Sequence, residues 1–396
     1  MSTDAFRFEY APGAIRYGRG CVETLGDELA QQDATNALLV TGQTVGTTEA
    51  VIDPVLDGGA DRIGPVFDET TPQKRLKTVL DGRALARTRE ADAIVSLGGG
   101  SSLDVATAIR ALSADDRDPE TIREAFERNQ TLSVNAQPQL PLIVIPTTLA
   151  GADCSMGAGI NAQTEDGVIR GGCYDARLMP DALCYDPALI ETTPSTVLYA
   201  SAMNGFDKGI ESLYSPASTP ITDATAAHGL ELLSRGLPAL GSGKRDDDTL
   251  HDAIVGTILV QYGVSRADGS TLSVIHAFGH GVNRGFDIQQ GEAHGIVAPH
   301  VLEAVFERID GNRTALARAL GVANVSDDDA TAVVNAVTEL RDALGLAQDL
   351  RSIDDMDRAD LSAVAATIAT DGLIANTPPG LELSQSEIET VLERAW

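Results

Sequence analysis

The chain has 396 residues and a formal net charge of −29, with 58 acidic against 29 basic side chains. A uniformly anionic surface repels phosphate, which argues against a nucleic-acid-binding protein. The length predicts two domains. The chain shows no charged-then-apolar leader and no apolar run approaching about 18 residues, so a soluble, cytoplasmic protein without membrane contact is expected. The high density of carboxylates is typical of a protein adapted to high salt.

The N-terminal half alternates short apolar runs with helical patterns. Three of the runs, at residues 37–42, 93–97 and 142–145, predict buried strands of a parallel sheet covered on both faces. After about residue 190, long Ala/Leu/Val patterns with helical period dominate. The clearest are residues 224–240, 250–264 and 330–344, the last with Ser326 as a predicted cap. We expect an α/β cofactor domain at residues 1–188, a helical domain at residues 189–396, and a cleft between them.

A glycine-rich turn follows the second predicted strand and opens a helix. Gly98, Gly99 and Gly100 would let the backbone approach a bulky anion, and the helix N-terminus offers free N–H groups and a partial positive charge. Ser101 adds a hydroxyl donor. The pattern predicts a phosphate cradle, although it is not the GxGxxG of the standard dinucleotide fold.

Hydroxyl side chains follow the third predicted strand. Thr147 and Thr148, with Leu149 after them, come directly after Pro146. Open α/β sheets bind their ligands at the carboxyl ends of parallel strands. The two turns together therefore predict a nucleotide-type cofactor.

Four of the six histidines fall within 25 residues: His276, His280, His294 and His300. The first two are four residues apart, which places both rings on one face of a helix. Imidazole is the commonest proton carrier near neutral pH and the commonest transition-metal ligand. This segment is therefore predicted to belong to an active site.

These motifs, taken in order, resemble the iron-containing alcohol dehydrogenase superfamily: a GGGSxxD turn ending in Asp104, a PTT turn, an HxxxH pair and His294 before glycine. The resemblance runs from Phe8 to Trp396. The turn at residues 146–151 is most similar to that of maleylacetate reductases. The resemblance implies a dehydroquinate synthase-like fold, with a Rossmann-like N-terminal domain and a helical C-terminal domain. It also implies NAD or NADP as cofactor and a homo-oligomer.

Two positions depart from the cofactor pattern that the resemblance implies. An acidic residue normally follows the first long strand and binds the adenosine ribose 2′-hydroxyl, but Gly42 stands here. Loss of that carboxylate removes repulsion against a 2′-phosphate, which favours NADP over NAD. Thr107 stands where the GGGSxxDxxK pattern has a lysine, which leaves that lysine's contribution to cofactor binding open.

The resemblance also implies a divalent metal such as iron or zinc, held by Asp and His four residues apart and by two later histidines. His276 and His294 match the last two ligand positions, and His280 matches a proton-relay histidine. The first two positions fall on Asn204 and Lys208. A protonated lysine has no lone pair, and an amide oxygen is a weak ligand for such a metal. On this alignment the usual four-ligand site is lost.

A second alignment with the family's ligand positions retains a metal site. Asp207 and Glu211 have ligand spacing on a helix and, with His276 and His294, could hold an ion. The first register is preferred because Glu211 and Tyr214 then match the family's own Glu and Tyr. Whether a metal binds stays open at this point.

We expect an NAD(P)-dependent oxidoreductase acting on a small carbonyl, alcohol or oxo-acid. The Lys208 ammonium would stand in place of the metal and stabilise charge on the reacting oxygen, and His280 would supply the proton route. One alternative is maleylacetate reductase, with Lys208 and Arg284 binding two carboxylates. The others are a sugar-phosphate lyase similar to dehydroquinate synthase and a non-catalytic dinucleotide-binding protein.

Overall fold

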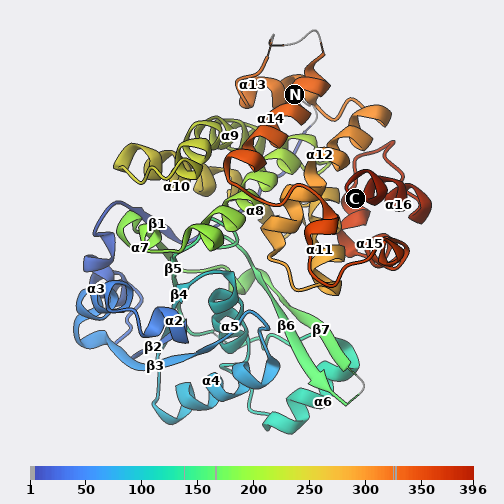
Figure 1. Ribbon diagram of the computed structural model, residues 1–396. Helices are drawn as coiled ribbons and strands as arrows, with labels where there is room; N and C mark the ends of the chain where they lie inside the picture. Colours follow the sequence, from blue (N-terminus) through green and yellow to red (C-terminus); the bar gives the residue numbers. More distant parts are fainter. Residues whose placement is uncertain (1–4, 138, 166, 324, 326–327) are drawn as a thin grey trace. The chain divides into compact units, whose positions relative to one another are not determined.

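The computed structural model describes residues 5–396 apart from 138, 166, 324 and 326–327, and it contains two compact units (Figure 1). The sheet unit comprises residues 10–148 and 153–193. The helical unit comprises residues 5–9, 149–152 and 194–396. Residues 149–152 thus belong to the helical unit although the chain on both sides of them belongs to the sheet unit. No sequence pattern predicts that these four residues belong to the helical unit.

The sheet unit contains a six-stranded parallel sheet in the order β1–β8–β5–β4–β2–β3. Its strands are β1 (Ala14–Tyr17), β2 (Ala37–Gly42), β3 (Ile63–Thr70), β4 (Ala93–Gly98), β5 (Leu142–Pro146) and β8 (Ala182–Tyr185). The three predicted strands are β2, β4 and β5, which confirms the predicted parallel sheet. Their runs of Leu, Ile and Val are buried on both faces, as expected for central parallel strands. A separate antiparallel pair is formed by β6 (Gly157–Thr164) and β7 (Gly167–Tyr174).

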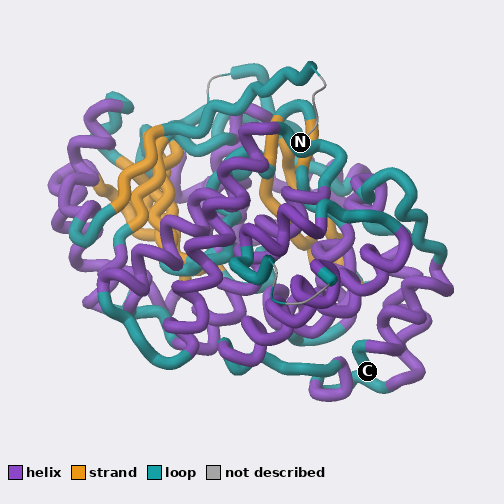
Figure 2. The backbone as a smooth tube through the Cα atoms, turned by 90° about the horizontal axis from the view of Figure 1, so that it is seen from above, coloured by secondary structure: helices purple, strands orange, loops and turns teal. Residues whose placement is uncertain are grey.

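Helices cover both faces of this sheet. Leu29 of α1 and Val55 of α3 share a core with Leu39 and Val95, while α5 contacts the strands from the other face. Colouring by secondary structure shows that helices make up most of the chain and that the strands lie in compact groups (Figure 2). The helices of the sheet unit are α1 (Leu25–Gln31), α2 (Gln43–Gly46), α3 (Glu49–Gly59), α4 (Leu76–Thr88), α5 (Gly100–Ala111), α6 (Pro119–Asn129) and α7 (Pro187–Glu191).

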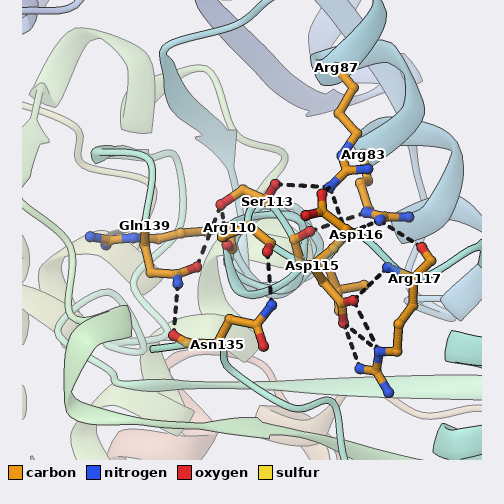
Figure 3. Close-up of polar contacts among 11 residues, drawn as sticks. Arg83, Arg87, Arg110, Ser113, Asp115, Asp116, Arg117, Asn135 and Gln139 are labelled. Carbon is orange, nitrogen blue, oxygen red and sulfur yellow. Dashed lines mark hydrogen bonds and ion pairs between the residues drawn. The ribbon is translucent and has the colours of Figure 1, made fainter. Parts of the chain in front are cut away.

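Arginines of α4 hold the carboxyl end of α5 and the turn after it (Figure 3). The buried Arg83 guanidinium donates to the carbonyls of Leu112 (3.1 Å), Asp115 and Arg117 (2.9 Å). Arg87 donates to the same Asp115 carbonyl at 2.6 Å. Carbonyls beyond a helix end have no partner within the helix, so buried side-chain donors are needed there. These contacts fix α5, whose opposite end carries the glycine turn.

The helical unit has α8 at its centre, packed against α9, α10 and α12. Its helices are α8 (Ser195–Tyr214), α9 (Pro220–Gly241), α10 (Asp247–Gln261), α11 (Val274–Gly285), α12 (Gln290–Arg308), α13 (Arg313–Ala319), α14 (Asp329–Ala343), α15 (Leu361–Ala369) and α16 (Gln385–Arg394). A two-stranded pair joins β9 (Ser265–Arg266) to β10 (Gly269–Ser270). Short 3₁₀ turns in the two units span Cys21–Thr24, Ala60–Arg62, Ala176–Leu178, Leu350–Ser352, Arg358–Asp360 and Gly372–Asn376.

The three predicted helices correspond to α9, α10 and α14. Helix α10 ends at Gln261, earlier than predicted, because Gly263 adopts a left-handed φ of 81°. The predicted cap Ser326 lies outside the described residues, and Asp328 caps α14 by accepting from the backbone N–H groups of Ala330 and Thr331. Within the part of the chain that the structure describes, no helix combines the length and apolar character needed to span a bilayer.

Replacing Arg83 by Met should lower the free energy of unfolding by about 2–4 kcal/mol, because buried carbonyls at the end of α5 lose their donor. Chemical denaturation measures the change. Arg89→Met is the matched control, since Arg89 is exposed at the end of the same helix. An Arg83→Met protein as stable as the Arg89→Met protein would contradict this role.

Candidate active site

Helix α8 presents a buried polar face. Asn204, Asp207, Lys208 and Glu211 recur at helical spacing on one side and are at most 9% exposed. Buried polar and charged groups require partners, so four such side chains in one helix are typical of a functional site.

The Lys208 ammonium is held by two acceptors. Its Nζ atom lies 3.2 Å from Asn204 Oδ1 and 3.4 Å from His276 Nε2. The Nε2 and Oδ1 atoms are themselves only 3.2 Å apart. The structure thus brings together both predicted departures, Asn204 and Lys208, with one of the predicted metal-position histidines.

Glu211 binds the N-terminus of α11. Its carboxylate accepts from the backbone N–H groups of Ser273 (2.9 Å), Ile275 (2.7 Å) and His276 (3.1 Å). The Ser273 side chain does not cap this helix. An anion at a helix N-terminus satisfies free donors and complements the helix dipole. Burial nevertheless raises the pKa of Glu211 to about 7, and the three N–H groups oppose that rise.

Glu211 also orients the His276 ring, because Oε2 lies 2.7 Å from His276 Nδ1. Burial, together with the nearby His294 and Lys208, lowers the pKa of His276 well below its ordinary value. The ring is therefore neutral, and the proton on Nδ1 faces the carboxylate. This leaves the lone pair of Nε2 directed at the Lys208 ammonium. Asn204 Oδ1 and Nε2 are then two acceptors that share one donor.

Asp207 and His294 form a second buried pair. Asp207 Oδ2 lies 3.3 Å from His294 Nδ1, but the two groups are not aligned for a hydrogen bond, and neither has another hydrogen-bond partner among the described residues. The His294 ring stacks edge-on against His276 with centroids 4.5 Å apart. Burial raises the pKa of Asp207 and lowers that of His294. A Cβ at Gly279 would lie 2.0 Å from the His294 ring, so this contact requires glycine on α11.

His280 lies one turn after His276 on α11 and contacts a residue that the sequence did not single out. Its Nδ1 atom is 3.1 Å from Asp371 Oδ2, and Arg284 Nη2 is 2.8 Å from the same oxygen. Burial alone would raise the pKa of Asp371, but the contacts with His280 and Arg284 lower it. The His280 side chain stays 31% exposed, so it can exchange protons with solvent.

The predicted phosphate cradle lies in the sheet unit. Gly98 ends β4 with φ of 135°, and Gly99 precedes α5. A Cβ at Gly99 would lie 3.0 Å from Thr148 Cγ2, while a Cβ at Gly100 would meet open space. The Thr147 N–H donates to the Gly98 carbonyl at 3.0 Å. The two predicted turns therefore lie side by side at the carboxyl ends of β4 and β5.

The other residues predicted to bind the cofactor lie at the ends of neighbouring strands or in the segments that follow the two turns. Gly42 ends β2 and pairs with Thr70 of β3, and a Cβ at Gly42 would lie 3.3 Å from the Thr70 carbonyl. Ser101 and Asp104 occupy the first turns of α5. Leu149 belongs to the helical unit, where its N–H donates to Ser201 Oγ at 3.0 Å.

Two glycines, of which the sequence reasoning missed Gly205, bring residues 149–152 against α8. A Cβ at Gly205 would lie 2.3 Å from the Leu149 carbonyl oxygen, so only glycine permits this approach. Gly151, three residues after Thr148, adopts φ of 63°, and a Cβ at this position would lie 3.5 Å from Lys208 Cδ. A glycine inside a long helical pattern, such as Gly205, is the signal that could have indicated a close approach.

The side chains present do not fit the divalent metal that the resemblance implies. Among the described residues, no group of three His, Cys, Asp or Glu side chains is arranged to hold an ion. Asn204 Oδ1 and His276 Nε2, which lie 3.2 Å apart, already face the Lys208 ammonium. A cation brought to these donors would meet the positive charge of Lys208.

Comparison with known proteins places the chain. The family model for iron-containing alcohol dehydrogenases matches residues 12–187, and the model for the C-terminal part of the Fe-containing alcohol dehydrogenase family matches residues 198–396. The chain belongs to the iron-containing alcohol dehydrogenase family. It is 25% identical to the maleylacetate reductase of Pseudomonas aeruginosa over 377 residues, which cover 93% of this chain and 96% of that protein.

Solved structures agree with the fold. A 1,3-propanediol oxidoreductase aligns with a TM-score of 0.88 at 22% identity, covering 99% of this chain and 100% of that one. A sulfoacetaldehyde reductase from Bifidobacterium kashiwanohense, in complex with NAD⁺, aligns with a TM-score of 0.84 at 18% identity and covers 99% of each chain. The resemblance stated from the motifs is confirmed, and the protein is an NAD(P)-dependent oxidoreductase.

The raised pKa of Glu211 predicts a pH-dependent effect of Glu211→Gln. The native carboxyl group, with a pKa of about 7, binds its proton more strongly than the unfolded chain, where the value is 4.5. Its contribution to stability is thus complete below pH 4.5 and is lost as the pH rises through 7. The free energy of unfolding of the wild type should therefore fall by up to about 3 kcal/mol relative to that of Glu211→Gln from pH 5 to pH 8.

Denaturation at several pH values measures this difference, with Glu339→Gln, an exposed carboxylate of α14, as control. A wild-type free energy of unfolding that stays constant or rises relative to that of Glu211→Gln towards pH 8 would contradict the assignment.

Proposed function

We propose that this protein transfers hydride between NAD(P) and a small carbonyl or alcohol, and that the Lys208 ammonium polarises the reacting oxygen in place of a metal ion. The observation that supports the proposal is the buried ammonium on Asn204 Oδ1 and His276 Nε2. In the family pattern the position of Lys208 belongs to a metal ligand. Lys208 supplies one positive charge and N–H donors at a position where the resemblance implies a ligand of a divalent ion.

The chemistry follows from that charge. When hydride reaches a carbonyl carbon, negative charge develops on the oxygen. A fixed donor aimed at that oxygen lowers the barrier, and a single such donor is worth about 10²- to 10³-fold in kcat. In the reverse direction the same cation favours loss of the alcohol proton. Asn204 and His276 hold the ammonium in place, so little reorganisation is needed during the reaction.

His280 is proposed as the proton route. It is partly exposed, it lies one turn from His276, and Asp371 orients its ring at 3.1 Å. An imidazole held in this way carries protons between a buried site and water.

The register with Asp207 and Glu211 as metal ligands is less well supported. Glu211 is engaged with three backbone N–H groups and the His276 ring. Asp207 faces His294 and has no second ligand at its side among the described residues. Both carboxyl groups lie in the same buried cluster as Lys208, whose ammonium opposes the rise in their pKa that burial causes.

NADP is proposed as the preferred cofactor because no carboxylate stands at Gly42. An acidic side chain there would bind the 2′-hydroxyl of NAD and repel the 2′-phosphate of NADP. A cytoplasmic location is proposed as well, and the dense negative charge of the chain supports adaptation to high salt.

Maleylacetate reduction is the second candidate. The 25% identity with the Pseudomonas enzyme supports it, as does Arg284, which lies beside His280 on α11 and is 38% exposed. A substrate with two carboxylates needs more than one cation. Comparing NADPH oxidation with neutral aldehydes and with dicarboxylic oxo-acids separates the two candidates. Absence of net NADPH oxidation with either class would instead favour a lyase or a non-catalytic binding protein.

Replacing Lys208 by Met should lower kcat at least about 100-fold, because the oxygen loses its charged donor. The dissociation constant for NADPH, measured by fluorescence titration, should stay within about twofold of wild type, since the cradle lies in the sheet unit. That titration also shows whether the variant is folded. Lys244→Met, at an exposed lysine, serves as the control. Turnover that survives Lys208→Met would refute the proposed role.

A further inference from the structure

The loop between β3 and α4 carries a lysine that no motif singles out. Lys74 is one of four lysines in a chain with a net charge of −29. It lies four residues after Thr70, at the carboxyl end of β3, the edge strand beside β2. This is the end of the sheet to which the glycine turn and Gly42 also belong.

Lys74 forms an ion pair with the GGGSxxD motif. Its Nζ atom lies 2.7 Å from Asp104 Oδ2. Asp104 follows Gly100, the first residue of α5, by four positions, so its carboxylate lies one helical turn from the N-terminus that is predicted to bind phosphate. The ammonium is therefore fixed beside the predicted phosphate cradle.

The loop is held in an unusual conformation. Lys74 adopts φ of 47°, a left-handed value that costs a lysine about 1 kcal/mol or more. The Lys74 carbonyl accepts from the Asn161 N–H at 3.0 Å, and the Asn161 side chain donates to the Gln73 carbonyl at 2.7 Å. Strand β6 thus keeps the strained residue in place. Such strain persists where the surrounding structure enforces it, which is common in binding loops.

The ion pair lies directly on the backbone of β6. A Cβ at Gly159 would be 3.5 Å from Lys74 Nζ and 3.8 Å from Asp104 Oδ2. The Lys74 side chain is still 30% exposed. An ammonium has three N–H groups, and Asp104 takes one of them.

Charge explains why a cation is needed here. A carboxylate close to a helix N-terminus repels an incoming phosphate unless a cation neutralises it. Burial raises the pKa of Asp104, and the Lys74 ammonium opposes that rise, so Lys74 stabilises the ionised form. The pair as a whole is neutral, and the cation is its more exposed member, at 30% against 19% for Asp104.

We propose that Lys74 binds the diphosphate of the dinucleotide, supplying from the β3–α4 loop the cation that is missing at Thr107. Thr107 lies on α5 three residues after Asp104, is buried, and cannot carry charge. Lys74 reaches Asp104 from the β3–α4 loop. This inference is independent of the role proposed for Lys208.

The test compares two lysines of the same region. Lys74→Met should weaken binding of ADP about tenfold or more, the value of one charge-assisted hydrogen bond, while adenosine, which has no phosphate, should bind within about twofold of wild type. Lys77→Met is the matched control, since Lys77 is 82% exposed and pairs with Asp81. It should change neither constant. Calorimetric titration gives both constants.

A double variant separates contact from neutralisation. If Lys74 contacts the diphosphate, Lys74→Met combined with Asp104→Asn should still bind ADP about tenfold more weakly than wild type. Recovery of ADP affinity in the double variant would overturn the proposal, because Lys74 would then only neutralise Asp104. Unchanged ADP affinity in Lys74→Met, or an equal loss for adenosine, would overturn it as well.

Discussion

A buried ammonium in the core of the helical unit is the constraint on which the rest of the site depends. Removing a cation from water costs several kcal/mol unless partners compensate for the lost hydration. Lys208 has Asn204 Oδ1 and His276 Nε2 as direct acceptors, and the buried carboxyl groups of Asp207 and Glu211 lie on the same helix. The polar face of α8 therefore acts as one unit, and loss of any member leaves another buried group without compensation.

The contact between α8 and α11 orients the groups around Lys208. Glu211 holds the first backbone N–H groups of α11 and the Nδ1 atom of His276. The same carboxylate thus fixes where the helix begins and which nitrogen of the ring faces Lys208. Close packing follows from glycines at the contacts, with Gly205 admitting the Leu149 carbonyl. The result is a hydrogen-bonded cation held between Asn204 on α8 and His276 on α11.

Much of the fold could be predicted from local pattern, because buried parallel strands are continuous apolar runs and amphipathic helices have their own period. The strands at residues 37–42, 93–97 and 142–145 and the glycine turn at residues 98–100 were found in this way. Contacts between residues that are far apart in the sequence produce no periodic pattern. The pairing of His280 with Asp371, the cap that Glu211 makes on α11 and the Lys74 ion pair therefore appear only in three dimensions. The position of Leu149 in the helical unit was hidden for the same reason.

The central claim is that a lysine, not an ion, polarises the reacting oxygen. The most direct measurement purifies the protein without added cations, dialyses it against a strong chelator, and determines metal content and NADPH-dependent turnover in the same sample. The account predicts full turnover in protein that contains far less than one equivalent of iron, zinc or any other divalent metal. Turnover that falls with the metal content and returns when iron or zinc is added would contradict it.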